Sequence, residues 1–307
     1  MATVPRTSAQ RARANGIELC WDSFSDAGAA PMLLIMGLAA QMIAWPDAFC
    51  ERLAQRGFRL VRFDNRDIGL STRVGSTGAP DIGAALTAAM QGKPVDSPYR
   101  LTDMAADAFG LLDALGIERP HVVGASMGGA IAQTMAIERP ERLRTLTSIM
   151  ATTGEPGLPR PTPAAMGVLL KPPVTTLDGY ICSYVETWKV LRAGSFPEDE
   201  ALDRERAEAA FARGLNPPGV ARQLAAISRR PAARRRCARF ACRRWCSTAT
   251  PTRSCRSRAA STPPTRFPAH ALSCSPGWDM LCRSRAGSAS STRSQPTRPE
   301  VVPRRSD

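Results

Sequence analysis

The sequence predicts an α/β fold in which a mainly parallel β-sheet carries helices on both faces. Short apolar or β-branched segments alternate with longer stretches of helical spacing, and residues 32–36 (MLLIM) are apolar without a break. An uninterrupted apolar strand is typical of a central parallel strand buried on both faces, and strand–helix alternation is typical of a parallel sheet. A chain of 307 residues can form one such domain with an inserted subdomain.

The first predicted elements follow from local patterns. Residues 17–21 (IELCW) alternate between apolar and polar side chains, as a half-buried strand does. After the 32–36 strand, Trp45-Pro46 precedes a predicted helix over 47–56, and residues 59–63 (RLVRF) predict the next strand. These elements form the first half of the alternation.

The next elements have clearer boundaries. Residues 102–115 carry apolar side chains at helical spacing, and we expect Thr102 to cap this helix and Gly116 to end it. Strands are predicted over 121–125 and 143–150. The alternation therefore continues to about residue 150.

The segment on which the functional interpretation depends joins the strand 121–125 to a helix. It contains Gly124-Ala-Ser126-Met-Gly128, followed by an alanine-rich helical run. A Gly-x-Ser-x-Gly sequence between a strand and a helix is typical of a nucleophile elbow, in which a serine occupies a strained turn. Glycine is needed at 124 and 128 where neighbouring backbone leaves no room for a Cβ atom. The following helix would direct its N-terminal N–H groups toward the serine. The alternative is a glycine-rich turn in another doubly wound protein.

Residues 154–227 change in character. A proline-rich stretch precedes two amphipathic segments, 177–192 and 198–213. Their position after a sheet strand favours a helical cap over the serine, although ordinary packing helices would give the same pattern. Three aromatic residues recur four positions apart and are expected to form mainly the interior of this cap: Tyr180, Tyr184 and Trp188.

Charge divides the chain sharply. Residues 229–307 hold 18 arginines and three acids, for a net charge of +15, whereas residues 1–228 have a net charge of −1. Six of the nine cysteines lie between 237 and 282, but their spacing matches no zinc pattern, so we expect no metal. The chain contains no apolar run of membrane-spanning length, and its N-terminal segment has no signal-peptide pattern. We therefore expect a cytoplasmic protein without a membrane partner.

The motifs together resemble the α/β-hydrolase superfamily. They are Met36-Gly37-Leu38, the loop Asp64-x-Arg66-Asp67-x-Gly69-x-Ser71 and the Gly-x-Ser-x-Gly-Gly elbow. Leu34-Ile35-Met36-Gly37 with Trp45-Pro46 is more specifically similar to small esterases related to aclacinomycin methylesterase. The resemblance covers about residues 17–227, is specific for the superfamily and is weak for the substrate.

The resemblance implies roles for individual residues. Ser126 would be the nucleophile, and the backbone N–H groups of Leu38 and Met127 would form the oxyanion hole. Asp64, Arg66 and Asp67 would brace the loop beside the site. The expected reaction is hydrolysis of a small, fairly apolar carboxylic ester through an acyl-enzyme, without a cofactor and without nucleic acid as a partner. Amidase, lactonase and haloperoxidase-like activities stay open, as does the oligomeric state.

The general base is missing from this pattern. A serine hydroxyl needs a histidine to accept its proton and a carboxylate to orient that histidine, and this superfamily places the acid and then the histidine after the serine. The chain has two histidines. His121 opens the elbow strand at the wrong end and is expected to be structural. His270 has no family motif around it, and no acid lies between Glu208 and His270.

A shifted reading frame supplies the missing motifs. With GC-rich codons read one base earlier, residues 245–255 permit Val-Leu-His-Gly-Asp-Ala-Asp-Pro-Leu-Val, and residues 276–282 permit Gly-Met-Gly-His-Ala-Leu-Pro. The acid would then fall at Thr252 and the base at Met280. We hypothesise a frameshift between about 228 and 237. This divides the chain into a hydrolase core (1–153), a helical cap (154–227) and an out-of-frame tail (228–307) that is expected to be disordered and to leave the C-terminal strands missing.

A different class of function fits the basic tail. Arginine-rich arms bind phosphates, so the alternative is a non-catalytic hydrolase-like protein whose tail binds nucleic acid or a membrane surface. Salt-sensitive binding that disappears on deletion of 229–307 would favour it.

Overall fold

The computed structural model describes residues 4–25, 28–75, 78–153, 161–194 and 196–229. The predictions made for His270, Thr252, Met280 and nearly all of the tail 228–307 lie outside these residues. The described chain forms six strands, eight α-helices and two 3₁₀ turns: β1 Arg6–Ala14, β2 Ile17–Phe24, β3 Ala30–Ile35, η1 Met42–Ala44, α1 Asp47–Ala54, β4 Phe58–Phe63, α2 Ile82–Met90, α3 Leu101–Ala114, β5 His121–Ala125, α4 Met127–Glu138, η2 Pro140–Arg142, β6 Thr145–Ile149, α5 Pro163–Leu169, α6 Leu177–Arg192, α7 Glu200–Ala212 and α8 Pro217–Ser228.

The six strands form one sheet in the order β1-β2-β4-β3-β5-β6. The pairs β4–β3, β3–β5 and β5–β6 are parallel, while β1–β2 and β2–β4 are antiparallel. The prediction of a mainly parallel α/β sheet is confirmed. Within the described residues β6 pairs only with β5, so it forms one edge of the sheet.

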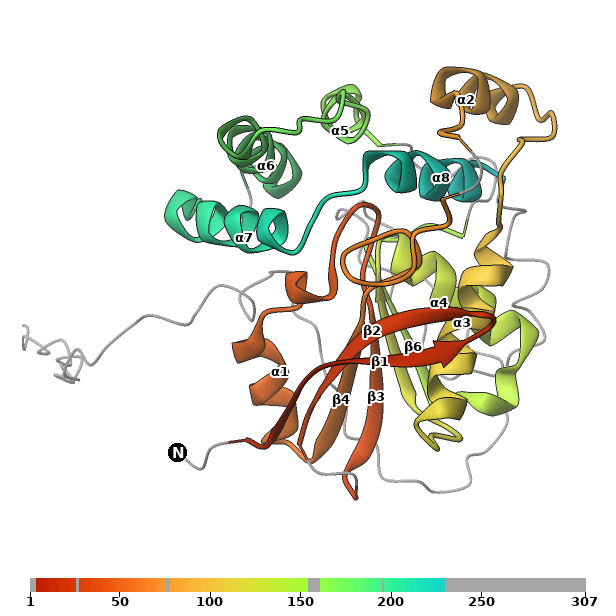
Figure 1. The fold of residues 1–307 in the computed structure, drawn as a ribbon, viewed down its shortest axis with the longest axis vertical. Helices are drawn as coiled ribbons and strands as arrows, with labels where there is room; N and C mark the ends of the chain where they lie inside the picture. Colours follow the sequence, from red (N-terminus) through yellow and green to blue (C-terminus); the bar gives the residue numbers. More distant parts are fainter. Residues whose placement is uncertain (1–3, 26–27, 76–77, 154–160, 195, 230–307) are drawn as a thin grey trace, which may run out of the picture.

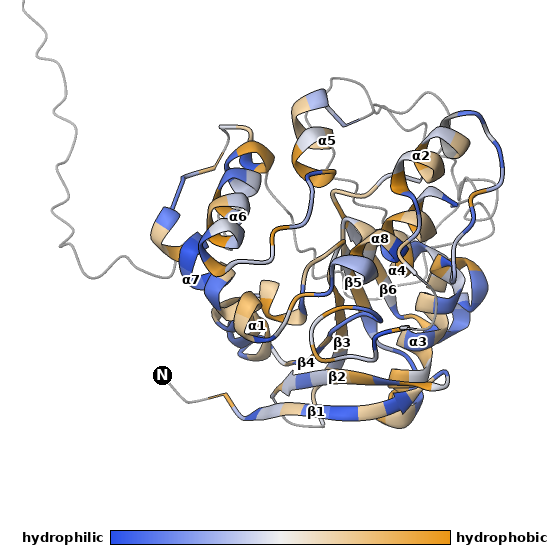
Figure 2. Ribbon diagram, turned by 45° about the horizontal axis from the view of Figure 1, so that its top comes forward, coloured by the Kyte–Doolittle hydropathy of each residue, from blue (hydrophilic) through white to orange (hydrophobic). Residues whose placement is uncertain are grey.

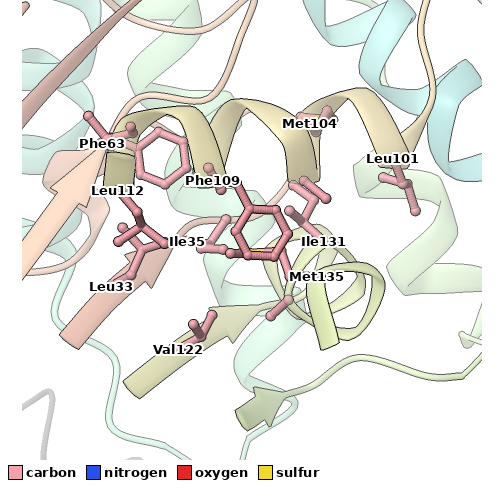
Figure 3. Close-up of a cluster of buried hydrophobic side chains, with 14 of the residues drawn as sticks. Leu33, Ile35, Phe63, Leu101, Met104, Phe109, Leu112, Val122, Ile131 and Met135 are labelled. Carbon is pink, nitrogen blue, oxygen red and sulfur yellow. The ribbon is translucent and has the colours of Figure 1, made fainter. Parts of the chain in front are cut away.

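Side chains of β3 alternate between two cores, which explains its unbroken apolar sequence. Leu33 and Ile35 pack with α3 and α4 on one face, as Figure 3 shows for the neighbouring Phe109 and Met135. Met32 and Leu34 pack with α1 on the other face. The sheet is therefore covered on both sides, and Figure 2 shows hydrophobic residues concentrated along its central strands.

Helices α5, α6 and α7, which belong to the predicted cap, pack in series beyond one end of the parallel strands (Figure 1). The helix α6 occupies the predicted range 177–192, and α7 lies within the predicted 198–213. The helix α8 differs from them because it packs against α2 and against loops of the core. No helix in the described part of the chain is long and apolar enough to cross a bilayer.

Several features of the fold differ from the prediction, and the helices α2, α5 and α8 were not anticipated. Thr102 does not cap α3: the helix begins at Leu101 with Arg100 as the N-cap, and the Asp103 carboxylate accepts a hydrogen bond of 2.7 Å from the Arg100 N–H. The predicted stop at Gly116 is confirmed by its left-handed φ of 65° directly after the helix. The strand β1 was not anticipated, because a largely exposed edge strand carries arginines rather than apolar alternation.

Candidate active site

Residues with strained backbone follow the carboxyl ends of the parallel strands. Each of the four parallel strands β3, β4, β5 and β6 is followed by a non-glycine residue with positive φ: Ala39 (61°), Asp67 (69°), Ser126 (52°) and Met150 (43°). Side chains disfavour this conformation, and such residues cluster where a structure holds a functional geometry. Ligands of open α/β sheets bind at this same edge. The candidate site therefore lies at the carboxyl ends of the parallel strands, around Ser126.

Ser126 lies at the junction of β5 and α4, with φ 52° and ψ −118°. Its N–H donates to the carbonyl of Ile149, the last residue of β6, at 2.9 Å. The flanking glycines are required by space: a Cβ at Gly124 would overlap the Gly128 carbonyl, and a Cβ at Gly128 would overlap the Ile35 carbonyl. The sharp turn thus depends on glycine at both predicted positions and presents a half-buried serine at the carboxyl end of β5.

Two backbone donors flank this serine. Gly37 lies against it, since a Cβ built on Gly37 would be 3.0 Å from the Ser126 Cβ and 3.5 Å from its Oγ. The next residue is Leu38, and Met127 begins α4. Neither the Leu38 N–H nor the Met127 N–H donates a hydrogen bond to another described residue. Both donors are free to receive an oxyanion, and the partial positive charge at the start of α4 favours one.

Asp64 is buried beneath this edge as part of the loop after β4. Its carboxylate accepts hydrogen bonds from the Met42 N–H at 2.7 Å and the Leu70 N–H at 3.0 Å, and it pairs with Arg213 at the end of α7. Burial raises the pKa of Asp64, while Arg213 and the two N–H groups oppose that rise. A carboxylate with all these partners holds the loop in place.

Arg66 and Asp67 join the same loop to two helices. Arg66 donates to both oxygens of Asp107 in α3 at 2.6 Å. The Asp67 carboxylate accepts hydrogen bonds from the Arg222 guanidinium of α8 at 2.7 and 2.9 Å and from the Tyr99 hydroxyl at 2.8 Å. Both guanidinium groups and both carboxylates are thus paired with another side chain, as expected of residues that brace the site.

His121 lies at the opposite end of β5. Its Nδ1 is 2.8 Å from the Thr145 hydroxyl, and its ring meets Phe58 edge to face at 5.5 Å between centroids. Burial lowers the pKa of His121. Ser126 lies five positions further along the chain, which is about 16 Å at the usual rise of a strand. It is the only histidine in the described ranges, so these ranges bring no imidazole to the serine.

Aromatic side chains hold the cap helices together. The Tyr180, Tyr184 and Trp188 rings lie in series with centroids 6.1 Å apart, and Phe211 of α7 lies 6.0 Å from Tyr180. The rings are half-buried and contact one another along α6 and toward α7, so they link these two helices, and their role as the interior of a cap stays a prediction.

A cavity of about 290 Å³ is lined in part by Met42 and Arg213, two partners of Asp64. It is bounded by β1, the η1 turn and the end of α7, and its lining residues are Arg6, Ser8, Ala9, Asp22, Met42, Ile43 and Arg213. Ser126 does not line this cavity. The candidate site therefore rests on the strained loops and the backbone donors.

Three bracing residues escaped the sequence interpretation: Arg213, Arg222 and Gln223. They lie more than 140 residues from the loop that they contact. One signal was present, because Gln223 directly precedes the apolar run 224–227 in α8 and is itself fully buried. A buried polar residue on such a helix requires hydrogen-bond partners elsewhere in the fold.

Comparison with known proteins gives consistent matches. A family model described as the alpha/beta hydrolase fold matches residues 30–231. Rhodomycin D methylesterase DauP of Streptomyces sp. (strain C5) is 34% identical over 225 residues, which cover 66% of this chain and 70% of that protein. Rhodomycin D methylesterase DnrP of Streptomyces peucetius is 32% identical over 225 residues with the same coverage.

Solved structures show the same fold. An enol-lactonase from Burkholderia xenovorans LB400 matches with a TM-score of 0.51 and 20% identity, over 74% of this chain and 76% of that one. The 2-hydroxy-6-oxo-6-phenylhexa-2,4-dienoate hydrolase of Rhodococcus sp. strain RHA1 matches with a TM-score of 0.51 and 21% identity, over 76% and 74%.

Proposed function

The chain belongs to the α/β-hydrolase fold family and resembles the rhodomycin methylesterases, and from this premise we propose that it is a serine hydrolase of carboxylic esters. In this proposal Ser126 is the nucleophile, and the N–H groups of Leu38 and Met127 are the oxyanion donors. The observation that carries it is the strained serine at the β5–α4 junction, flanked by two backbone donors that have no other partner among the described residues.

The reaction follows from this geometry. The Ser126 oxygen attacks the ester carbonyl carbon as its proton passes to a base. The described residues do not supply this base, which would be the histidine of the restored frame or, in this chain, hydroxide. The carbonyl oxygen becomes an oxyanion that accepts hydrogen bonds from Leu38 and Met127. Collapse of this intermediate breaks the bond to the alcohol, which takes up a proton and leaves an acyl group on Ser126. Water then attacks the acyl group and releases the acid.

The names of two relatives favour a methyl ester as the substrate. DauP and DnrP are both described as methylesterases, and each covers 66% of this chain. We therefore extend the proposal to methyl esters of fairly apolar acids that enter beneath the cap. A panel of methyl, ethyl and butyl esters of one acid, assayed with a chain whose reading frame is restored, tests this: the methyl ester should be cleaved fastest, and a preference for butyl esters would contradict it.

Turnover by this chain is proposed to be severely impaired. The described residues bring no histidine to Ser126, and the tail carries His270 without the family motif. A shift of reading frame between 228 and 237 accounts for the loss, and the family match ends within that window, at residue 231. Sequencing the gene across these codons tests the frameshift: a shifted frame that is closed by stop codons, or that lacks the acid and histidine motifs, would refute it.

Activity provides the direct test. Loss of the base costs such a site about a millionfold in turnover, while binding and the oxyanion donors leave about 10³-fold over water. We expect negligible hydrolysis of p-nitrophenyl esters by the 307-residue chain and recovery in a frame-restored chain. The Ser126→Ala variant of the restored chain is the control and should be inactive. Efficient turnover by the unrestored chain would contradict the proposal.

A further inference from the structure

A fully buried glutamine in α8 connects two loops of the candidate site. Gln223 is 0% exposed. Its Nε2 donates to the Arg66 carbonyl at 2.9 Å, and its Oε1 accepts from the Ala39 N–H at 3.2 Å. A carbonyl oxygen can only accept, so the amide nitrogen must face Arg66 and the amide oxygen must face Ala39. The side chain therefore has one orientation, fixed by its partners.

The contact with Ala39 falls on a tight turn beside Ser126. The Ala40 N–H donates to the Gly37 carbonyl at 3.3 Å, so Gly37 to Ala40 form a β-turn with Leu38 and Ala39 at its centre. Ala39 has a φ of 61°. A positive φ at the third position of a turn belongs to a turn whose central peptide is rotated relative to the common type, and glycine is preferred there. The central peptide is the one between Leu38 and Ala39, and its N–H is the group that Gln223 holds.

The helix that carries Gln223 is itself anchored. Arg222, the neighbouring residue, makes two bonds to Asp67 at 2.7 and 2.9 Å, and Asn216 at the start of α8 donates to the Asp67 carbonyl at 2.9 Å. Arg222 and Asp67 are both buried. Moving α8 would separate this buried ion pair, so Gln223 reaches Ala39 from a fixed base.

We propose that Gln223 is a positioning residue for the oxyanion donor Leu38, an inference that rests on the proposed function. By accepting the Ala39 N–H, Gln223 holds the central peptide in its unusual orientation and compensates for the side chain that Ala39 carries in place of glycine. Without this acceptor the turn relaxes toward the common type. The adjoining Gly37–Leu38 peptide, which carries the proposed donor N–H of Leu38, then shifts relative to Ser126. Gln223 touches neither substrate nor Ser126 and acts only through this turn.

The test is single-turnover acylation of the full chain by p-nitrophenyl acetate at pH 9, where hydroxide substitutes for the missing base. Release of p-nitrophenolate gives the rate, and mass spectrometry of the Ser126 peptide locates the acetyl group. The variant is Gln223→Met, which keeps the length of the side chain and removes both hydrogen bonds. The matched control is Gln133→Met: Gln133 is also 0% exposed but donates to the Ser148 hydroxyl at 2.9 Å, away from the turn.

Removal of an oxyanion donor costs about 10²–10³ in rate, so a displaced donor should cost about ten- to a hundredfold. We expect Q223M to lower the acylation rate by that factor and to leave the half-saturating ester concentration unchanged. The acylation rate of Q133M should stay within about threefold of the parent's, because loss of this buried hydrogen bond affects stability and not the turn. Amide exchange of the peptide that contains Leu38 and Ala39 should accelerate in Q223M and stay unchanged in Q133M.

Adding Ala39→Gly gives a rescue experiment. Glycine adopts positive φ without strain, so the turn no longer needs Gln223, and A39G/Q223M should recover most of the rate. If Q223M does not fold, Gln223→Glu replaces it: its carboxylate still accepts from Ala39 and should acylate nearly as fast as the parent, and a tenfold loss would overturn the proposal.

The outcomes separate the two proposals. If Ser126→Ala reacts as fast as the parent, Ser126 is not the nucleophile, and both proposals are wrong. If Ser126→Ala is slow while Q223M and Q133M react alike, or if A39G fails to rescue Q223M, then the positioning role is wrong and the nucleophile stands.

Discussion

The two ends of β5 carry different kinds of residue in different kinds of backbone. His121 at the amino end is relaxed, with its ring against Phe58 and its Nδ1 beside a threonine hydroxyl. Ser126 follows the carboxyl end with a φ of 52°, and the loop after β4, at the same end of the sheet, carries a buried network around Asp64 and Asp67. One strand thus ends in packing and continues into a candidate reaction centre. The comparison teaches that chemistry is concentrated where the backbone is held in costly conformations.

The largest expected effect concerns what the carboxyl end lacks. Restoring the reading frame after about residue 228 should raise p-nitrophenyl ester turnover about 10⁶-fold, because it would supply the acid and the histidine that the described residues do not bring to Ser126. Removing the imidazole at the amino end with His121→Gln should leave turnover of the restored chain unchanged. Loss of turnover in H121Q would mean that the two ends of β5 are not functionally separate.

The second prediction compares ion pairs at the two ends of the sheet. Arg222→Met leaves the buried Asp67 without its cation and should lower the free energy of unfolding by about 3–5 kcal/mol. Arg142→Met, near the amino end, breaks the exposed pair with Asp113 and should cost about 0–1 kcal/mol. Urea unfolding of the two variants measures the difference. Equal costs would show that the network around Asp67 is no more critical than an exposed ion pair.

The smallest expected effect is the pH dependence contributed by His121. Burial lowers its pKa in the folded protein, so the folded chain binds this proton less readily than the unfolded chain. The stability associated with neutral His121 is therefore present above its unfolded pKa of about 6.5 and is lost as the pH falls through the folded pKa. In H121Q the free energy of unfolding should decline less between pH 7 and pH 5. An unchanged decline would assign it to other groups.

The same comparison shows what the sequence could predict. The elbow, its glycines and β5 were predictable, because a strand, Gly-x-Ser-x-Gly and a helix are adjacent along the chain. The apolar run of β3 was equally clear, since burial on both faces leaves a local signature. Thr102 misled because any threonine before an apolar run can serve as a cap, whereas the actual cap contact is made by Asp103.

The support of the site could not be predicted in this way. Arg222 and Gln223 contact loops more than 140 residues earlier, and their positions depend on how α8 packs against the core. The strand β1 was missed because exposed edge strands favour charged residues, which hide the alternation. Local patterns thus locate the strained serine that we propose as the nucleophile, and tertiary packing determines how the loops near it are held.

The central claim is that Ser126 has oxyanion donors without a general base. The most direct test is the pH dependence of p-nitrophenyl acetate hydrolysis by the 307-residue chain between pH 5 and pH 9, with the rate of Ser126→Ala subtracted. Without a base the reaction needs hydroxide, so the Ser126-dependent rate should rise about tenfold per pH unit with no inflection. A rate that levels off above an apparent pKa near 6–7 would reveal an imidazole acting on Ser126 and would contradict the account.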